Sequence, residues 1–487
     1  MKSKKINGPH IKDSDTTSKI MTRLLIALAP IVCFALFKNS FMAYFYSEIS
    51  VFKALHPIFI ILVAIITSYA SEILYFRLAL KHTLRKSLAL TRDSFTIIPG
   101  LFLALIIPIN TPLWIVAIGA FCANIIGKML FGGFGQNIFN PALIGYLIIY
   151  ASYGALMGNT LSGLDTIATA TPLANLASLN YYGTYETVVG TYGSLLNFLC
   201  GSIPGTLGEV SKLLIIIAFI YLTVTKTIKW RIPTFYIATV FIITLVIGLN
   251  SDMGIWYPVF HILSGGLLFG AVFMATDPVT SPITNIGQVF YGIALGILTV
   301  SLRFFTSYPE GCATSILCMN ILVPVFDKIG VYLKYNIKRI YIPIIISLLL
   351  ISCVSISAIN KIGDAKKGND NIINEKVKID NVKVDGDKKV YSVSSKGWGV
   401  VKADVEVVDK KIISIIVTDS KGETQWSEIE KNNYIYKVVS NQENIDDLDA
   451  VSGSTFSSDA LKNMVKKVIS SAEAVSEAVK RARPSVI

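Results

Sequence analysis

The sequence predicts a polytopic α-helical membrane protein with about 10–11 transmembrane helices, followed by an extracytoplasmic α+β domain. Three observations predict this fold. The 487 residues are 53% hydrophobic and 16% charged, with a mean hydropathy of +0.59, which is too apolar for a soluble protein. Apolar segments recur up to residue 359. Beyond that point the chain becomes polar and charged.

The chain begins with a polar, basic leader, residues 1–19, which has no cleavable signal sequence and which we expect in the cytoplasm. Most of the following apolar segments approach the ~20 residues that a helix needs to cross a bilayer. Three of them, 95–109, 141–153 and 212–225, are shorter. The segments lie at roughly 20–38, 54–76, 95–109, 112–130, 141–153, 212–225, 232–250, 257–276, 287–303, 309–326 and 341–359.

The net charge of +12 follows the positive-inside rule, so it does not indicate a nucleic-acid partner. Lysine and arginine cluster in residues 1–23, 77–92, 226–231 and 328–339, and alternate counting of the segments places all four clusters in the cytoplasm. The loop 154–211 contains neither residue type and falls outside. The protein is therefore predicted to be a multi-pass protein of the cytoplasmic membrane, in contact with lipid.

The C-terminal part is predicted to be an anchor helix (341–359), a linker (360–390) and a small domain (391–487). Within the domain, "ADVEVV" (403–408) alternates apolar and polar residues as a strand does, and "DKK" is a turn into a second strand. A helix is predicted where apolar residues recur with helical spacing, at Leu461, Met464, Val465 and Val468. The six cysteines lie before residue 354 without CxxC spacing, so we expect no metal site.

Two seven-residue stretches share a pattern: "DTIATAT" (165–171) and "DAVSGST" (449–455). Each begins with Asp and ends with Thr, each precedes a predicted helix, and both are predicted to lie outside. Pro172 suits the first helical position, which makes Thr171 an N-cap. A phosphate on either Thr would meet free N–H groups. The alternative is that both are ordinary capping threonines. The candidate binding residues are Thr171, Thr455, Asp165, Thr169, Ala170, Asp449, Ser452, Gly453 and Ser454.

Polar residues inside or beside apolar segments are candidates for an ion path, because charges are costly in a bilayer. They are Glu72, Asn140, Asp277 and Glu310. Asp277 precedes "PVTSPIT", which is typical of an interrupted helix with exposed carbonyls. Interfacial capping is the alternative for Asp277 and Glu310.

Residues 1–335 resemble the D subunit of the Rnf electron-transport complex and the B subunit of the sodium-pumping NADH:quinone oxidoreductase. The resemblance rests on "GKMLFGGFGQNIFNPALIGY" (127–146), "ATPL" (170–173), "HILSGGLLFGAVFMATDPVTSPIT" (261–284) and "RFFTSYPEGCATSILCMNILVPVFD" (303–327). Residues 341–487 resemble the Rnf G subunit, an anchored FMN-binding domain, through "SSKGWGVVKADVEV" (394–407) and "DAVSGSTFSSDAL" (449–461). The chain looks like a natural fusion of the two.

The resemblance implies an FMN joined by a phosphoester bond to Thr171 and another to Thr455, each attached by an extracytoplasmic flavin transferase. Ala168, Thr169 and Ser454 depart from the family motif. The resemblance also implies that other Rnf-type membrane subunits and iron–sulfur subunits are partners of this chain. A riboflavin in the membrane region is implied by analogy with the sodium pump.

The function expected from the resemblance is that of an electron-transfer subunit, not catalytic alone, in an ion-translocating (Na⁺ or H⁺) ferredoxin:NAD oxidoreductase. One alternative is a flavinylated conduit from a membrane dehydrogenase to an extracytoplasmic acceptor. The other is a non-redox transporter with an exported binding domain, which predicts no covalent flavin.

Overall fold

The computed structural model forms two units, Met1–Ile362 and Gly363–Ile487, each of which is described by itself. It describes residues 16–46, 50–157, 171–306, 311–385, 388–396, 400–408, 411–419, 429, 433–441, 445, 448, 458, 460–469 and 471.

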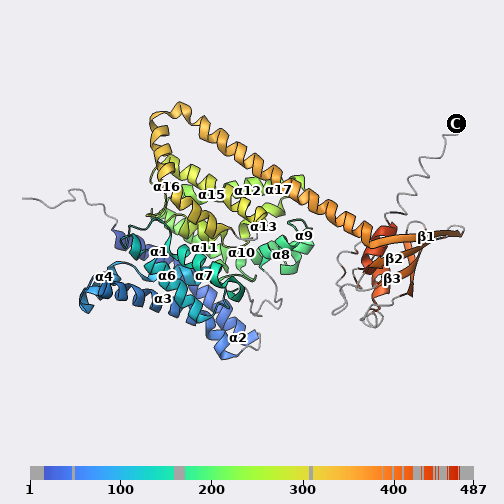
Figure 1. The fold of residues 1–487 in the computed structure, drawn as a ribbon, viewed down its shortest axis with the longest axis horizontal. Coiled ribbons are helices and arrows are strands. Elements are labelled where there is room, and N and C mark those ends of the chain that lie inside the picture. Colours follow the sequence, from blue (N-terminus) through green and yellow to red (C-terminus); the bar gives the residue numbers. More distant parts are fainter. Residues whose placement is uncertain are drawn as a thin grey trace, which may run out of the picture. The chain divides into compact units, whose positions relative to one another are not determined.

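The first unit is helical throughout its described part, and its helices fall into two successive groups. The earlier group is α1 (Thr17–Leu36), η1 (Phe37–Met42), α2 (Ala43–Tyr46), α3 (Val51–Leu78), α4 (Leu84–Asp93), α5 (Ile97–Ile106), α6 (Leu113–Ile125), η2 (Met129–Phe131) and α7 (Pro141–Met157). The later group is α11 (Lys212–Val224), α12 (Arg231–Asn250), α13 (Trp256–Leu263), α14 (Leu267–Phe269), η5 (Gly270–Met274), α15 (Asn285–Phe305), α16 (Cys312–Tyr335), η6 (Ile337–Arg339) and α17 (Tyr341–Lys376). Figure 1 shows α3, α4 and α6 on one side of the unit and α12, α15 and α16 on the other.

The prediction of a polytopic membrane protein is confirmed. Among the described residues seven helices are long and apolar enough to cross a membrane, and nine if each bent pair counts as one span. The helices Pro141–Gly154 and Lys212–Val224 are apolar but shorter, as predicted for 141–153 and 212–225. The short segment predicted at 95–109 is the second half of a bent pair, Leu84–Asp93 with Ile97–Ile106.

Each group contains one bent pair, and the two bends are built alike. Leu84–Asp93 meets Ile97–Ile106 at 57°, and Trp256–Leu263 meets Leu267–Met274 at 64°. Both bends contain a serine followed by a residue with positive φ: Ser94 with Phe95 (φ 50°), and Ser264 with Gly265 (φ 66°). A bend leaves backbone carbonyls without helical partners, and lipid cannot supply donors.

A buried cation satisfies the carbonyls at each bend. Lys128 Nζ, just beyond α6, donates to the Ser94 carbonyl at 2.9 Å. Arg303, in the last turn of α15, donates to the carbonyls of His261 at 2.6 Å and Ser264 at 3.4 Å. α6 and α15 are the spans that follow the two bends. In both groups, therefore, a cation in or just beyond the span after the bend donates to the free carbonyls of the bend.

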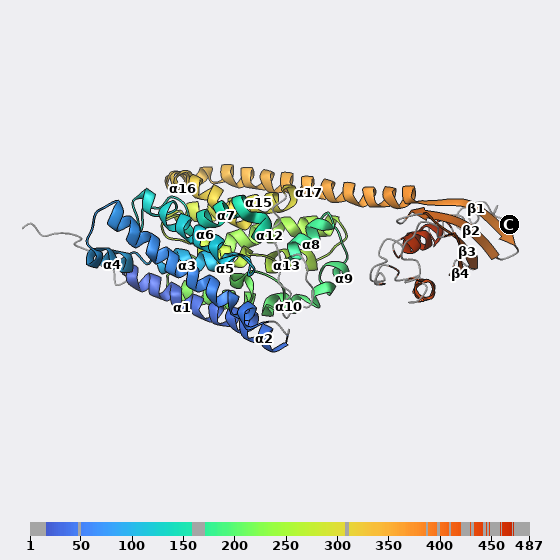
Figure 2. The same cartoon turned by 60° about the horizontal axis from the view of Figure 1, so that its bottom comes forward.

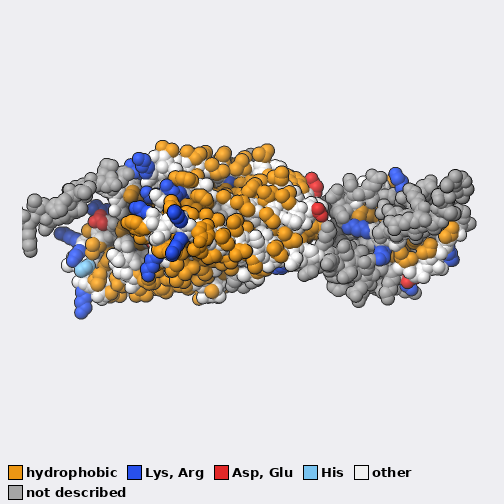
Figure 3. Space-filling view, turned by 90° about the horizontal axis from the view of Figure 1, so that it is seen from above, with side chains coloured by type: hydrophobic (Ala, Val, Ile, Leu, Met, Phe, Trp, Pro, Cys, Tyr) orange, Lys and Arg blue, Asp and Glu red, His pale blue; other side chains and the backbone are white. Residues whose placement is uncertain are grey.

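The described part of the region between the two groups, residues 171–211, packs onto the helices. It contains α8 (Pro172–Ser178), α9 (Tyr185–Val188), η3 (Gly190–Tyr192), α10 (Leu195–Cys200) and η4 (Leu207–Glu209). In Figures 1 and 2, α8 and α9 lie at the end of the unit opposite α4. Figure 3 shows that lysine and arginine side chains gather over the α4 end, while hydrophobic side chains cover the middle. The predicted orientation requires basic side chains at the cytoplasmic end of the helices, and the gathering of basic side chains at one end agrees with it. Which end faces the cytoplasm stays a prediction.

The second unit contains a four-stranded antiparallel sheet in the order β1 (Val377–Asp385), β2 (Lys388–Lys396), β3 (Val400–Val408) and β4 (Lys411–Asp419). The predicted strands at 403–408 and after "DKK" are β3 and β4. The predicted helix is described over 460–469. Its four apolar residues are fully buried in one core with the sheet and with Tyr434 and Val438 of α19 (Tyr434–Ser440). On the outer face, the hydrogen bond from Lys388 to Glu406 (3.0 Å) lowers the pKa of the Glu406 carboxyl.

The segment expected to be a linker, 360–390, has a different structure. α17 continues to Lys376, and β1 begins at the next residue, Val377. The low content of large apolar residues suggested a linker, but "DAKKGNDNIINEK" (364–376) extends a helix that the anchor has already nucleated.

Close packing of α6 against α7 depends on glycine. A Cβ atom at Gly145 would overlap the Gly119 carbonyl oxygen and lie 2.8 Å from the Ala123 Cβ. At Gly154, near the end of α7, a Cβ would meet nothing within 4 Å.

We expect Gly145→Ala to destabilise the protein by about 1–3 kcal/mol, because the added methyl group forces the two helices apart. Gly154→Ala is the matched control and should leave the melting temperature almost unchanged. Thermal unfolding of the purified protein in detergent measures both. Equal melting temperatures for the two variants would contradict the described α6–α7 contact.

Candidate functional site

Thr171 lies where the sequence predicted it, at the N-cap of α8. Its backbone is non-helical (φ −54°, ψ 152°), Pro172 occupies the first helical position, and its Oγ1 accepts a hydrogen bond from Ala174 N at 3.4 Å. Its side chain is half-buried. The cap prediction is confirmed; whether the hydroxyl carries a phosphoester stays a prediction.

α8 is held on the membrane unit by its apolar face and by the turn after it. Leu173 and Leu176 are buried in the main core. Asn180 and Tyr181 then adopt positive φ (54° and 64°), which is rare for a bulky side chain and needs support from its surroundings. Tyr181 has this support: its hydroxyl donates to the Arg303 carbonyl, its own carbonyl accepts from Tyr257 at 3.1 Å, and its ring stacks on Phe304 at 4.7 Å.

The other residues of the two threonine motifs cannot be placed in the same way. Asp165, Thr169 and Ala170 lie outside the described residues, as do Asp449, Ser452, Gly453, Ser454 and Thr455. What is described next to the second motif is helical: Ser458 and residues 460–469.

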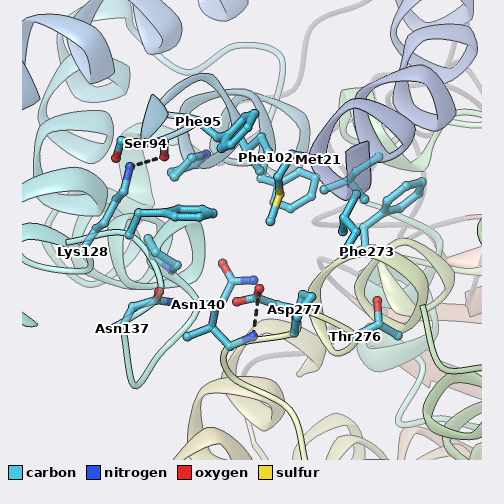
Figure 4. A pocket seen from close by; sticks show the side chains of 18 of the residues that line it. Met21, Ser94, Phe95, Phe102, Lys128, Asn137, Asn140, Phe273, Thr276 and Asp277 are labelled. Atoms are coloured by element: carbon cyan, nitrogen blue, oxygen red, sulfur yellow. Dashed lines mark hydrogen bonds between the residues drawn. The ribbon is translucent and has the colours of Figure 1, made fainter. Parts of the chain in front are cut away.

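Two of the four ion-path candidates, Asn140 and Asp277, line one cavity of the membrane unit (Figure 4). Asn140 Oδ1 accepts from Ala142 N at 3.1 Å, which fixes the start of α7. The Asp277 carboxylate accepts from Val279 N at 3.4 Å and Thr280 Oγ1 at 3.1 Å, and also from the Asn137 side chain. Asp277 thus caps the turn after η5 and also faces a cavity; its place at a membrane interface stays a prediction. Glu310 lies outside the described residues.

The cavity combines aromatic walls with a polar side. Phe95, Phe102, Phe134 and Phe273 line it, with Met21 at the α1 side. The polar residues lie on the loops and helix ends in Figure 4: Ser94, Lys128, Asn137, Asn140, Thr276 and Asp277. Aromatic faces with a few convergent polar groups are typical of a site for a planar ligand.

Glu72, the third ion-path candidate, forms a buried ion pair beside this cavity. Its carboxylate is fully buried on α3, Lys128 Nζ lies 3.1 Å from Oε2, and the Thr96 hydroxyl donates to the same oxygen. Oε1 has no hydrogen-bond partner among the described residues. Lys128 therefore serves three roles: it neutralises Glu72, caps Ser94 and lines the cavity.

Sequence reasoning missed Lys128, although a signal was present. Lys128 stands in the apolar segment 112–130, where a charge is costly unless it has a partner. The role of Arg303 at the second bend likewise required the tertiary structure.

We expect Glu72→Gln or Lys128→Met to destabilise the protein by about 3–5 kcal/mol each, because either change leaves an uncompensated buried charge. The double variant Glu72→Gln/Lys128→Met should be more stable than either single variant. Thermal unfolding in detergent measures all three. A double variant that loses as much stability as the sum of the singles would contradict the ion pair.

Comparison with known proteins matches both units. The model of the NQR2, RnfD, RnfE family matches residues 5–335, and that of the FMN-binding domain matches residues 397–470. The D subunit of the proton-translocating ferredoxin:NAD(+) oxidoreductase complex of Clostridium ljungdahlii is 35% identical, over 68% of this chain and 96% of its own length. The D subunit of the Na(+)-translocating complex of Acetobacterium woodii is also 35% identical, over 69% and 95%. The B subunit of the Na(+)-translocating NADH-quinone reductase of Klebsiella pneumoniae is 35% identical, over 50% and 60%.

Proposed function

This chain belongs to the NQR2, RnfD, RnfE family, and we propose that it is the D-type electron-transfer subunit of an ion-translocating ferredoxin:NAD oxidoreductase. One observation carries the proposal: a D-type membrane unit and an FMN-binding domain occur in a single chain. The partners are then the other membrane subunits and the iron–sulfur subunit of such a complex. A non-redox transporter has no use for an FMN-binding domain.

The proposed attachment sites for FMN are the hydroxyls of Thr171 and Thr455, as phosphoesters made by a separate flavin transferase. The position of Thr171 supports this. Its side chain is half-buried and stands at the start of α8, which the core contacts of Leu173 and Leu176 hold in place. A flavin fixed there would keep one position on the membrane unit, which electron transfer between fixed partners requires. For Thr455 the proposal rests on the motif and on the FMN-binding domain match.

The aromatic cavity is the proposed site for the noncovalent flavin, riboflavin. An isoalloxazine ring has two apolar faces and a polar edge of carbonyl and nitrogen atoms. The phenylalanine walls fit the faces, and Asn137, Asn140 and the Lys128 ammonium fit the edge. Bound there, the flavin would supply an electron carrier inside the membrane.

The transported ion is not fixed by similarity, because the D subunits of the two complexes, each 35% identical to this chain, differ in the ion that their names give. We propose Glu72, Asn140, Asp277 and Glu310 as residues of the ion path. Two of them face the cavity and Glu72 pairs with Lys128 at its wall, so reduction of a bound flavin would change the electrostatic potential at all three.

Ferredoxin:NAD activity in membranes distinguishes the proposal from a conduit to an extracytoplasmic acceptor. We expect deletion of the gene for this chain to abolish ferredoxin-dependent NAD⁺ reduction, and the wild-type gene to restore it. Normal activity after deletion would favour the conduit.

Thr171→Ala and Thr455→Ala should each remove about half of the flavin fluorescence of the chain on a denaturing gel, and the double variant all of it, because each removes one attachment oxygen. The chain is coexpressed with a flavin transferase. Thr184→Ala is the matched control, because Thr184 caps α9 in the same region and accepts from Thr187 N. Full fluorescence in the double variant would show that the sites are wrong.

Denaturation of the Thr171→Ala/Thr455→Ala variant should release about one noncovalent flavin per chain, since the proposal places one flavin ring in the cavity. Adding Thr276→Trp, which places an indole in the cavity, should abolish this release. The same Trp change in the otherwise wild-type chain should leave the covalent fluorescence intact, which controls for folding. Unchanged release with Thr276→Trp would rule out the cavity as the flavin site.

A further inference from the structure

The anchor helix α17 contacts the membrane unit unevenly along its length. Its first turns are exposed: Ile342, Ile346 and Leu349 are 45%, 52% and 64% exposed. Near residue 360 the helix is buried instead: Ala358 is fully buried and Ile362 is 2% exposed, and both belong to the main core. The helix is therefore attached to its own membrane unit near Ile362, where that unit ends and from which the FMN-binding unit follows, and not by its first turns.

Lys361 forms the polar part of this attachment. Its Nζ donates to the Phe304 carbonyl and lies 5.2 Å from the centre of the Tyr181 ring and 6.0 Å from that of Phe305. Phe304 is in the last turn of α15, where carbonyls have no helical partners and the helix dipole favours a cation. The ring of Tyr181 adds a cation–π contact.

Tyr181 links this attachment to the first flavin site. It lies ten residues after Thr171, and its positive φ is maintained by contacts with Arg303, Tyr257 and Phe304. Two neighbouring carbonyls at the end of α15 are thus capped from two directions: Arg303 O by Tyr181, and Phe304 O by Lys361. The end of α15 therefore holds both the segment that follows Thr171, through Tyr181, and α17, through Lys361.

We propose that Lys361 is a positioning residue, which docks the exit of α17 on the end of α15 and so limits the separation between the two covalent flavins. The flavin part of this inference rests on the proposed function; the docking does not. Without this contact α17 would be joined to the membrane unit only through η6 at its start and through the packing of Ala358 and Ile362, so the point from which the second flavin starts would be less well fixed. The simpler alternative is that Lys361 extends its ammonium to the membrane surface and docks nothing.

The test uses the full-length flavinylated chain with a nitroxide at Gly363→Cys, where an added Cβ atom would meet nothing within 4 Å. The exposed cysteines Cys33, Cys200, Cys318 and Cys353 are changed to Ala, and the buried Cys122 and Cys312 are kept. Lys361→Met removes the charge and keeps the apolar stem. Lys338→Met is the matched control, since Lys338 is an exposed lysine just before α17.

We expect the mobile fraction of the nitroxide to rise at least about tenfold in Lys361→Met, the effect of losing one hydrogen bond to a charged group, and to stay unchanged in Lys338→Met. Lys361→Arg should restore the immobile signal. In half-reduced samples, pulsed dipolar spectroscopy between the two flavin semiquinones should give a broader distance distribution for Lys361→Met than for the wild type.

A nitroxide equally immobile in Lys361→Met would overturn the docking and favour the surface alternative. A mobile nitroxide with an unchanged flavin–flavin distribution would overturn the positioning role. Chains that carry no covalent flavin would refute the proposed function instead, and the nitroxide would then report on the docking alone.

Discussion

Every backbone carbonyl in a lipid environment needs a donor from the protein, and the bent helix pairs make this requirement acute. Lys128 and Arg303 meet it at the two bends, each from the helical segment that follows. The requirement explains why two cations are buried in so apolar a unit. It also explains why Glu72 is buried: a lysine needs an anion nearby when no water is present. The ion pair, the bend and the cavity wall are therefore one structural feature.

The need for donors to free carbonyls also acts at both proposed flavin sites of the membrane unit, the α8 region and the aromatic cavity. At the end of α15 the free carbonyls are capped by Tyr181 and Lys361, so the helix end holds both the α8 region and the anchor. At the first bend, the cation that caps Ser94 also faces the aromatic cavity. Polar groups that could bind a cofactor are therefore concentrated where helices end or bend, because the backbone groups of a regular helix are already hydrogen-bonded to one another.

Much of the fold could be predicted because its signals are local. Apolar runs near span length predicted the helices, alternation at 403–408 predicted β3, and Pro172 after a threonine predicted the start of α8. The segment 360–390 was different, because helix continuation to Lys376 depends on the preceding anchor and not on its own composition. Lys128 was missed for a related reason: its partners are 34 and 56 residues away, beyond any local pattern.

The sequence by itself determined the membrane class, the approximate spans, the family resemblance of both units and the threonine at the start of α8. These depend on composition, periodicity and motif, which are properties of short stretches. Only the tertiary structure decided that Glu72 is paired, that Asn140 and Asp277 face one cavity, and that Lys361 reaches the end of α15. Such contacts join segments far apart along the chain, and the need to satisfy buried charges and carbonyls selects them only once the helices have packed.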